Sequence, residues 1–152
     1  MASNRGERFC VAVYLTGDTH NVVDVDKVVR FDASGLTRGD YLIILGDFGF
    51  IWTPEQEEYL ENNELADARR SDERWLDWFE SKPYTTLWID GNHENFDLLE
   101  TYPIREWHGG RVQCIREHVI HLMRGEIYDI DGRSFFAMGG AYSADKGRRT
   151  PG

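Results

Sequence analysis

Three short segments that combine glycine with potential metal ligands occur in order along the chain. They are Gly17-Asp18-Thr19-His20, Gly46-Asp47-Phe48-Gly49 and Gly91-Asn92-His93-Glu94, and each follows a run of apolar, β-prone residues. Asp18 and His20 are two residues apart, so in an extended strand tip their side chains point to the same side. Carboxylate and imidazole groups together suit a divalent transition metal. The pattern predicts a hydrolytic site with two metal ions.

The chemistry of each side chain suggests its role in such a site. The Asp47 carboxylate has two oxygens and can bridge two ions, and Asn92 offers a neutral oxygen that leaves the charge of an ion intact. Two divalent ions that face only the carboxylates of Asp18 and Asp47 keep a net positive charge, which suits a phosphate group and an activated water. His93 is then available as general acid for the leaving oxygen, and Glu94 is placed to orient it.

Each motif is weak when taken alone, because Gly-Asp dipeptides are usually turns and Asn-His pairs are common in loops. The three motifs in order, each after a buried strand, favour a metal site over unrelated turns. We expect Gly17, Gly46 and Gly91 to let the backbone turn sharply and approach an ion or a phosphate closely.

The elements that would position the motifs are short buried strands. Continuous apolar, β-branched and aromatic runs indicate strands at residues 9–15, 41–45 and 85–89. Strands without alternation are buried on both faces, so we expect a parallel or mixed sheet between two other layers. Ligands in such sheets collect beyond the carboxyl ends of the strands, where all three motifs lie.

Helical periodicity separates these strands. Apolar residues at helical spacing over residues 22–29 predict a helix with Asn21 as its cap. Thr53-Pro54 has the chemistry of a second helix start, and a break near Ser71 is an open alternative. The order strand-helix-strand-helix-strand predicts right-handed crossovers and a parallel sheet. Three aromatic residues lie on one face of the second helical segment: Trp75, Trp78 and Phe79.

The second half of the chain has a different texture. Short apolar runs predict four strands, at residues 112–115, 119–123, 126–130 and 134–138. Asp131-Gly132 is a strong signal for a two-residue hairpin turn between the last two.

Length and composition limit the possible classes of protein. The 152 residues suffice for one ordinary domain, and 41% hydrophobic and 13% aromatic residues argue against a disordered chain. The formal charge of −10 argues against non-specific binding to nucleic acid or to an anionic membrane, although bound cations would still attract a phosphate. Residues 9–15 are far too few to span a membrane. Cys10 and Cys114 are expected to be buried free thiols, which fits a cytoplasmic protein.

The trio GDTH, GDFG and GNHE resembles the pattern of the calcineurin-like metallophosphoesterase family, D-x-H, G-D and G-N-H-[DE], from about residue 9 to the end. The resemblance implies an α/β/β/α sandwich, in which two β-sheets pack face to face between helices. It implies that Asp18 and His20 bind one metal ion, that Asp47 bridges two and that Asn92 binds the second. His93 would assist catalysis, and the two divalent ions would be Mn, Fe, Zn or similar.

The chain departs from the family pattern after the third motif. The family continues with a further metal-binding histidine and a G-H-x-H segment, whereas the histidines after His93 are His108, His118 and His121, without that context. We interpret His118 and His121 as surface or strand histidines. Residues 1–152 are therefore expected to form a single domain that is the N-terminal part of such an enzyme, truncated, with an incomplete second sheet, exposed apolar faces and weak metal binding.

A second departure concerns the substrate. The protein-phosphatase branch of the family carries an aspartate and an arginine after its second motif, where this chain has Phe48-Gly49-Phe50-Ile51-Trp52. A serine/threonine protein phosphatase is therefore not expected, and core packing is favoured for this stretch over a pocket for a flat group.

The leading interpretation is a metal-dependent phosphoesterase that hydrolyses a phosphodiester or phosphomonoester with a hydroxide held between the metals. Its substrate would be small or nucleotide-like. The alternative is a non-catalytic remnant or metal-binding module, which the missing histidines support. A calcium-binding protein is a weaker third reading, because His20 is a poor calcium ligand and no EF-hand loop is present.

Overall fold

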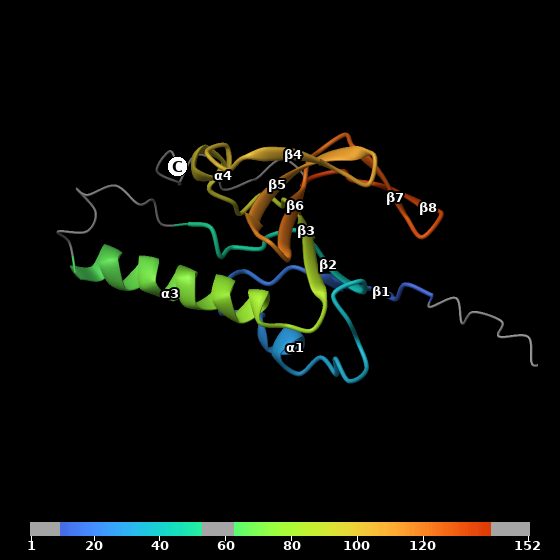
Figure 1. The fold of residues 1–152 in the computed structure, drawn as a ribbon. Helices are drawn as coiled ribbons and strands as arrows, with labels where there is room; N and C mark the ends of the chain where they lie inside the picture. Colours follow the sequence, from blue (N-terminus) through green and yellow to red (C-terminus); the bar gives the residue numbers. More distant parts are fainter. Residues whose placement is uncertain (1–9, 53–62, 141–152) are drawn as a thin grey trace, which may run out of the picture.

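The computed structural model describes residues 10–52 and 63–140, which form two β-sheets and three helices. The strands are β1 (Val13–Gly17), β2 (Tyr41–Leu45), β3 (Thr85–Ile89), β4 (Ile104–Trp107), β5 (Gly110–Arg116), β6 (Val119–Leu122), β7 (Ile127–Ile130) and β8 (Arg133–Phe136). The larger sheet has six strands in the spatial order β1-β2-β3-β6-β5-β4, and β7 and β8 form a separate two-stranded sheet (Figure 1).

The half of the large sheet that carries the motifs is parallel. β1, β2, β3 and β6 run in the same direction, and β5 and β4 are antiparallel to their neighbours. Gly17 pairs with Leu45, and Leu45 pairs with Ile89, so the first three strands end level with one another. The predicted order of strands and helices is confirmed, and it delivers all three motifs to one edge of the sheet.

The helices differ from the prediction at their ends. They are α1 (Asp26–Val29), α3 (Asn63–Glu80) and α4 (Phe96–Leu99). α3 is continuous, so the alternative of a break near Ser71 is wrong, and the helix start predicted at Thr53-Pro54 lies outside the described residues. α1 is short, and Asn21 does not cap it, because Asn21 has φ 56° and its side-chain amide donates to the Gly49 carbonyl at 2.8 Å.

Both faces of the central strand β2 are buried, as continuous apolar runs predict. Leu42 and Ile44 pack with α1 and α3 residues such as Phe79 in one hydrophobic cluster. Tyr41 and Ile43 point to the opposite face and pack in a second cluster that includes residues of β7. The molecule is therefore layered as helices, large sheet and small sheet, which is the α/β and metallophosphoesterase-like architecture that was expected, with two strands in the described second sheet (Figure 1).

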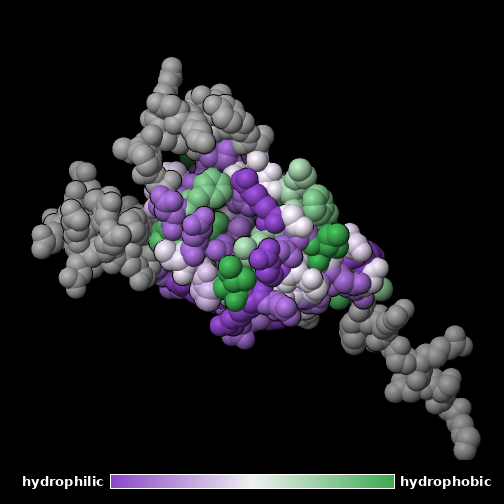
Figure 2. Space-filling model, turned by 90° about the horizontal axis from the view of Figure 1, so that it is seen from above, coloured by the Kyte–Doolittle hydropathy of each residue, from purple (hydrophilic) through white to green (hydrophobic). Residues whose placement is uncertain are grey.

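The first strand is shifted and less buried than predicted. It covers Val13–Gly17 rather than residues 9–15, and Tyr14 and Leu15 are 42% and 60% exposed. β1 lies at the edge of the sheet. Among the described residues it has a neighbouring strand on one side only, so its apolar sequence does not imply burial. Figure 2 shows apolar residues scattered between polar ones on the face seen from above.

The prediction of buried thiols is wrong for Cys10, which is exposed, whereas Cys114 is half-buried and both are free.

The second half contains one strand more than the sequence indicated. The four predicted strands correspond to β5, β6, β7 and β8, and Asp131 and Gly132 form the predicted turn with φ values of 53° and 73°. β4 was missed because its sequence, Ile-Arg-Glu-Trp, has two charged residues and lies on an exposed sheet edge. No described helix is long and apolar enough to cross a bilayer.

The layered core leads to a prediction about stability, in which the same substitution is compared at a buried and at an exposed position. Ile44→Ala removes a side chain that is fully buried on β2, and we expect it to lower the free energy of unfolding by about 2–5 kcal/mol. Ile104→Ala on β4, where the side chain is 54% exposed, should cost at most about 1 kcal/mol. Urea unfolding of both variants measures the difference, and equal losses would contradict the assignment of β2 to the centre of the core.

Candidate metal centre

The three motifs surround one pocket at the carboxyl edge of the parallel strands. The pocket has a volume of about 230 Å³, and Asp18, Asp47 and Asn92 line it, one from each motif. Its remaining lining residues follow the same strands or lie near the end of the described chain: Leu45, Gly46, Ile89, Asp90, Gly91, Met138 and Gly140. Side chains that are more than 70 residues apart in sequence thus share one hollow.

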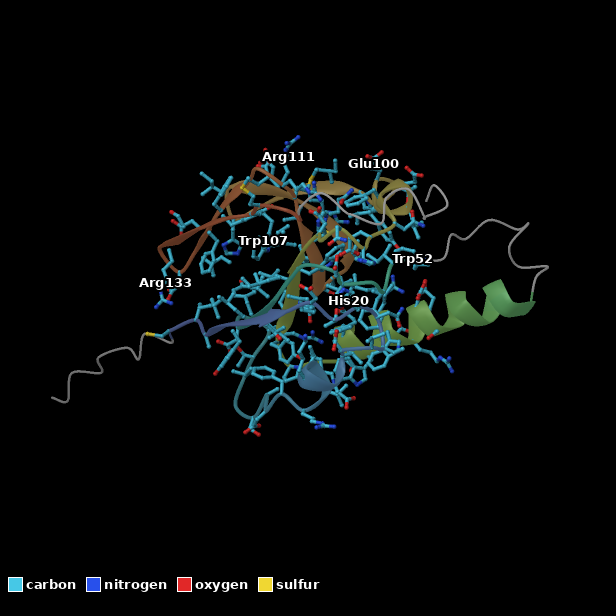
Figure 3. The ribbon with its side chains drawn as sticks, turned by 180° about the vertical axis from the view of Figure 1, so that it is seen from behind. His20, Trp52, Glu100, Trp107, Arg111 and Arg133 are labelled. Carbon is cyan, nitrogen blue, oxygen red and sulfur yellow. The ribbon has the colours of Figure 1, made fainter. Side chains whose placement is uncertain are left out.

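Asp47 lies at the centre of this arrangement. Its side chain is nearly fully buried, and Oδ2 lies 3.0 Å from Nε2 of His20. Its other oxygen, Oδ1, accepts a hydrogen bond of 2.6 Å from the backbone N–H of His93. His20, Asp47 and His93 form a group whose potential ligand atoms all lie within 4.8 Å of one another. Figure 3 shows His20 near the centre of the view, between the helix layer and the upper strands.

This donor set fits a divalent transition metal. Ligands bound at about 2.1 Å to one ion are roughly 3.0–3.5 Å apart, which agrees with the His20–Asp47 separation of 3.0 Å. Nδ1 of His20 lies 3.3 Å from the Asp24 carboxylate, and such a partner fixes the ring so that Nε2 faces an ion. The structure thus brings together all five predicted site residues, with Asp18 and Asn92 on the pocket wall and the other three in the cluster.

The first and second motifs are bound to each other through their backbones. The N–H groups of Thr19 and His20 both donate to the Asp47 carbonyl, at 3.1 and 2.7 Å, and the Thr19 hydroxyl donates to Phe48 at 2.8 Å. His20, Asn21 and Asp47 have positive φ values of 45°, 56° and 40°. Each such conformation costs on the order of 1 kcal/mol, and strained residues of this kind cluster at functional sites.

Glycine is required at two points where the motif loops touch one another. Gly46 has φ +108°, and a Cβ on it would lie 3.1 Å from Oδ1 of Asp18. A Cβ on Gly91 would collide with the side chain and the backbone nitrogen of Asp47. Gly46 and Gly91 thus allow a close approach between the loops, whereas a Cβ on Gly17 would meet no described atom within 4 Å. The predicted close approach of these glycines to an ion or a phosphate stays a prediction.

Glu94 joins the loops, a role that differs from the predicted orientation of His93. Its buried carboxylate accepts hydrogen bonds from the backbone N–H groups of Phe48, Gly49 and Gly91, at 2.8, 3.3 and 3.3 Å. Burial raises the pKa of Glu94 to about 7, against the lowering effect of these amides. Glu94, which was interpreted from the sequence as a residue that orients His93, therefore holds the second and third motifs in register.

The aromatic residues after the second motif belong to the core, as the sequence favoured. Phe48 and Phe50 are fully buried, and Phe48 stacks on Trp88 with ring centroids 4.8 Å apart. Trp52 is the exception in this stretch, with 47% of its surface exposed. These packed aromatic side chains support the second motif from within the core, and they do not line the pocket.

The later histidines are strand or surface residues, as interpreted from the sequence. His108 bonds the Asp129 carbonyl through Nδ1, and Nδ1 of His118 lies 3.1 Å from the hydroxyl of Thr85. His121 is buried on β6. None of the three joins the cluster around Asp47 among the described residues.

A buried polar network behind the third motif escaped the sequence reasoning. Asp90 is 2% exposed, lies 3.2 Å from Nε2 of His121 and accepts a hydrogen bond from Nε of Arg124. Burial raises the pKa of Asp90, but the bonds and charges of His121 and Arg124 outweigh burial and hold the pKa below its usual value. An aspartate at the end of a buried strand, directly before the third motif, is the signal that could have identified it.

Comparison with known families agrees with this geometry. The family model described as calcineurin-like phosphoesterase matches residues 11–147. The chain therefore belongs to the calcineurin-like phosphoesterase family, whose members hydrolyse phosphoesters with the help of divalent metals. No curated protein and no solved structure gives a significant match.

The contact between Gly91 and Asp47 generates a prediction for the centre. Gly91→Ala places a methyl group against Asp47, so we expect a loss of roughly 1–3 kcal/mol in stability and at least tenfold weaker Mn²⁺ binding. Gly17→Ala is the matched control, because its methyl group enters open space. Thermal melting and titration calorimetry measure both effects, and a Gly91→Ala variant that binds Mn²⁺ like the wild type would refute the close approach.

Proposed function

We propose that this protein is a metal-dependent phosphoesterase that hydrolyses a small phosphodiester or phosphomonoester. The observation that carries the proposal is the convergence of Asp18, Asp47 and Asn92 on one pocket, with His20 and His93 beside Asp47. Membership of the calcineurin-like phosphoesterase family supports the same chemistry.

The proposed centre holds two divalent ions, of Mn, Fe, Zn or a similar metal. Asp18 and His20 would hold one ion and Asn92 the other, and Asp47 would contribute to both through its two carboxylate oxygens. When bound, the ions supply positive charge for the phosphate and lower the pKa of water so that it can attack phosphorus. Asp24 fixes the His20 ring, and the backbone N–H of His93 fixes Asp47, so both ligands are oriented by the chain itself.

The ring of His93 would donate a proton to the leaving oxygen. Its ring stands 5.4 Å from that of His20, at an interplanar angle of 71°, and its own backbone is bound to Asp47. These contacts hold His93 beside the proposed ligands, where a general acid for the leaving oxygen would have to stand.

The pocket favours a small substrate. Its volume of about 230 Å³ admits a phosphate and a modest organic group. Leu45, Ile89 and Met138 supply the apolar part of the lining. The aromatic side chains of Phe48 and Phe50 are buried in the core, so they do not offer a stacking surface to a nucleotide base.

Asp47→Asn tests the metal centre. The amide keeps the shape of the side chain and removes its negative charge, so we expect Mn²⁺ affinity to fall at least tenfold in titration calorimetry. Asp129→Asn, on the hairpin sheet, is the control with the same change of charge away from the pocket. Identical isotherms for Asp47→Asn and the wild type would remove Asp47 from the site and overturn the proposal.

His93→Asn tests the general acid through its dependence on the leaving group. With Mn²⁺, kcat for an alkyl phosphoester should fall by about 10²–10⁴-fold, because a poor leaving group needs the proton. Hydrolysis of the corresponding p-nitrophenyl ester should fall far less. Equal losses with the two substrates would contradict proton donation by His93.

The alternative of a non-catalytic metal-binding module remains an outcome of these tests. It is favoured by the absence of His108, His118 and His121 from the cluster within the described residues. Tight Mn²⁺ binding that depends on Asp47, without turnover of either ester, would support this alternative.

A further inference from the structure

Arg124 is a half-exposed basic side chain that is fixed beside the pocket. Its Nε donates to the buried carboxylate of Asp90, and Nη2 lies 3.4 Å from the Gly91 carbonyl. The guanidinium lies over the ring of Phe96 at 5.3 Å, and a side chain on Gly139 would collide with it. Despite these contacts, 49% of the Arg124 side chain remains exposed.

The anchors of Arg124 belong to the wall of the proposed metal site. Asp90 and Gly91 line the pocket, and so does Gly140, whose N–H donates to the Asp90 carbonyl at 2.8 Å. The lining contributed by the described residues includes three carboxylates and no basic side chain. Arg124 thus adds positive charge at the rim of a site that otherwise depends on bound cations for attracting a phosphate.

The two oxygens of the Asp90 carboxylate are shared between Arg124 and His121. Gln113 donates through Nε2 to the Leu99 carbonyl, which leaves its Oε1 to face Nδ1 of His121 at 2.8 Å. Nε2 of the same ring faces Asp90 at 3.2 Å. Both ring nitrogens of His121 therefore face oxygen atoms of buried side chains.

The ring of His121 also lies against Trp88, with ring centroids 4.3 Å apart, so its position is fixed on this side too. Asp90 and His121 are buried, so the half-exposed guanidinium of Arg124 is the part of this group that a ligand can approach.

From this arrangement we propose that Arg124 is a substrate-binding residue that holds phosphate oxygens beside the metal centre, oriented by Asp90. The inference rests on the proposed phosphoesterase function and adds a residue to the same site. A guanidinium fits the task because it can offer two parallel N–H donors to a phosphate, whereas a lysine offers a point charge.

Binding of inorganic phosphate to the Mn²⁺-loaded protein, measured by titration calorimetry, tests this inference without turnover. Charge-assisted hydrogen bonds of this kind change affinity by roughly 10- to 100-fold, so Arg124→Gln should weaken phosphate binding to that extent. Arg124→Gln should bind Mn²⁺ within twofold of the wild type, because Arg124 is not among the proposed ligands.

Arg111→Gln is the matched control. Arg111 is also exposed and also donates through Nε to a carboxylate, that of Glu126 at 2.6 Å, but it lies away from His20 (Figure 3). It should bind both Mn²⁺ and phosphate as the wild type does. Arg124→Lys keeps the charge and should show a smaller loss of phosphate affinity. It replaces Arg124→Gln in the comparison if Arg124→Gln proves unstable in thermal melts.

The possible outcomes separate the two proposals. Intact Mn²⁺ binding with equal phosphate affinity in the wild type and the Arg124 variants overturns the role of Arg124 and leaves the metal centre standing. A wild-type protein that binds neither Mn²⁺ nor phosphate overturns the metal centre and this inference with it. Loss of phosphate affinity in the Arg124 variants, but not in Arg111→Gln, supports the assignment.

Discussion

The site depends on the position of one buried carboxylate, that of Asp47. Its backbone adopts a left-handed conformation with φ 40°, its carbonyl accepts two N–H groups of the first motif, and its side chain accepts an N–H of the third. A buried carboxylate without compensation is unfavourable by several kcal/mol. Neighbouring donors offset part of this, and bound cations would offset more, so the strained and acidic arrangement is understandable as a cation site.

The sheet makes this arrangement possible. Three parallel strands end in register at Gly17, Leu45 and Ile89, so three separate loops begin at the same level. Glu94 then joins the second and third loops through backbone amides, and Asp90 connects the third loop to His121 on β6 and to Arg124 just after it. The proposed metal ligands thus stand on a rigid frame, which is what preorganised hydrolytic chemistry needs.

Much of this could be predicted from the sequence, because it depends on local patterns. Unbroken apolar runs identified β2 and β3, and the glycine-led motifs identified the ligand candidates from Asp18 to His93. The exposure of Tyr14 and Leu15 could not be predicted, since an edge strand and a central strand have the same local sequence. The contacts of Asp90 with His121 and Arg124 join residues more than 30 positions apart, and no local pattern reports them.

The most direct test of the central claim is anomalous diffraction from crystals of the protein grown with Mn²⁺. The account predicts anomalous density within about 2.2 Å of the Asp47 carboxylate, on the side that faces Asp18 and Asn92. A second acidic group, formed by Glu80, Glu117 and His118, offers an internal comparison away from the motifs. Density at that group with none beside Asp47 would contradict the account.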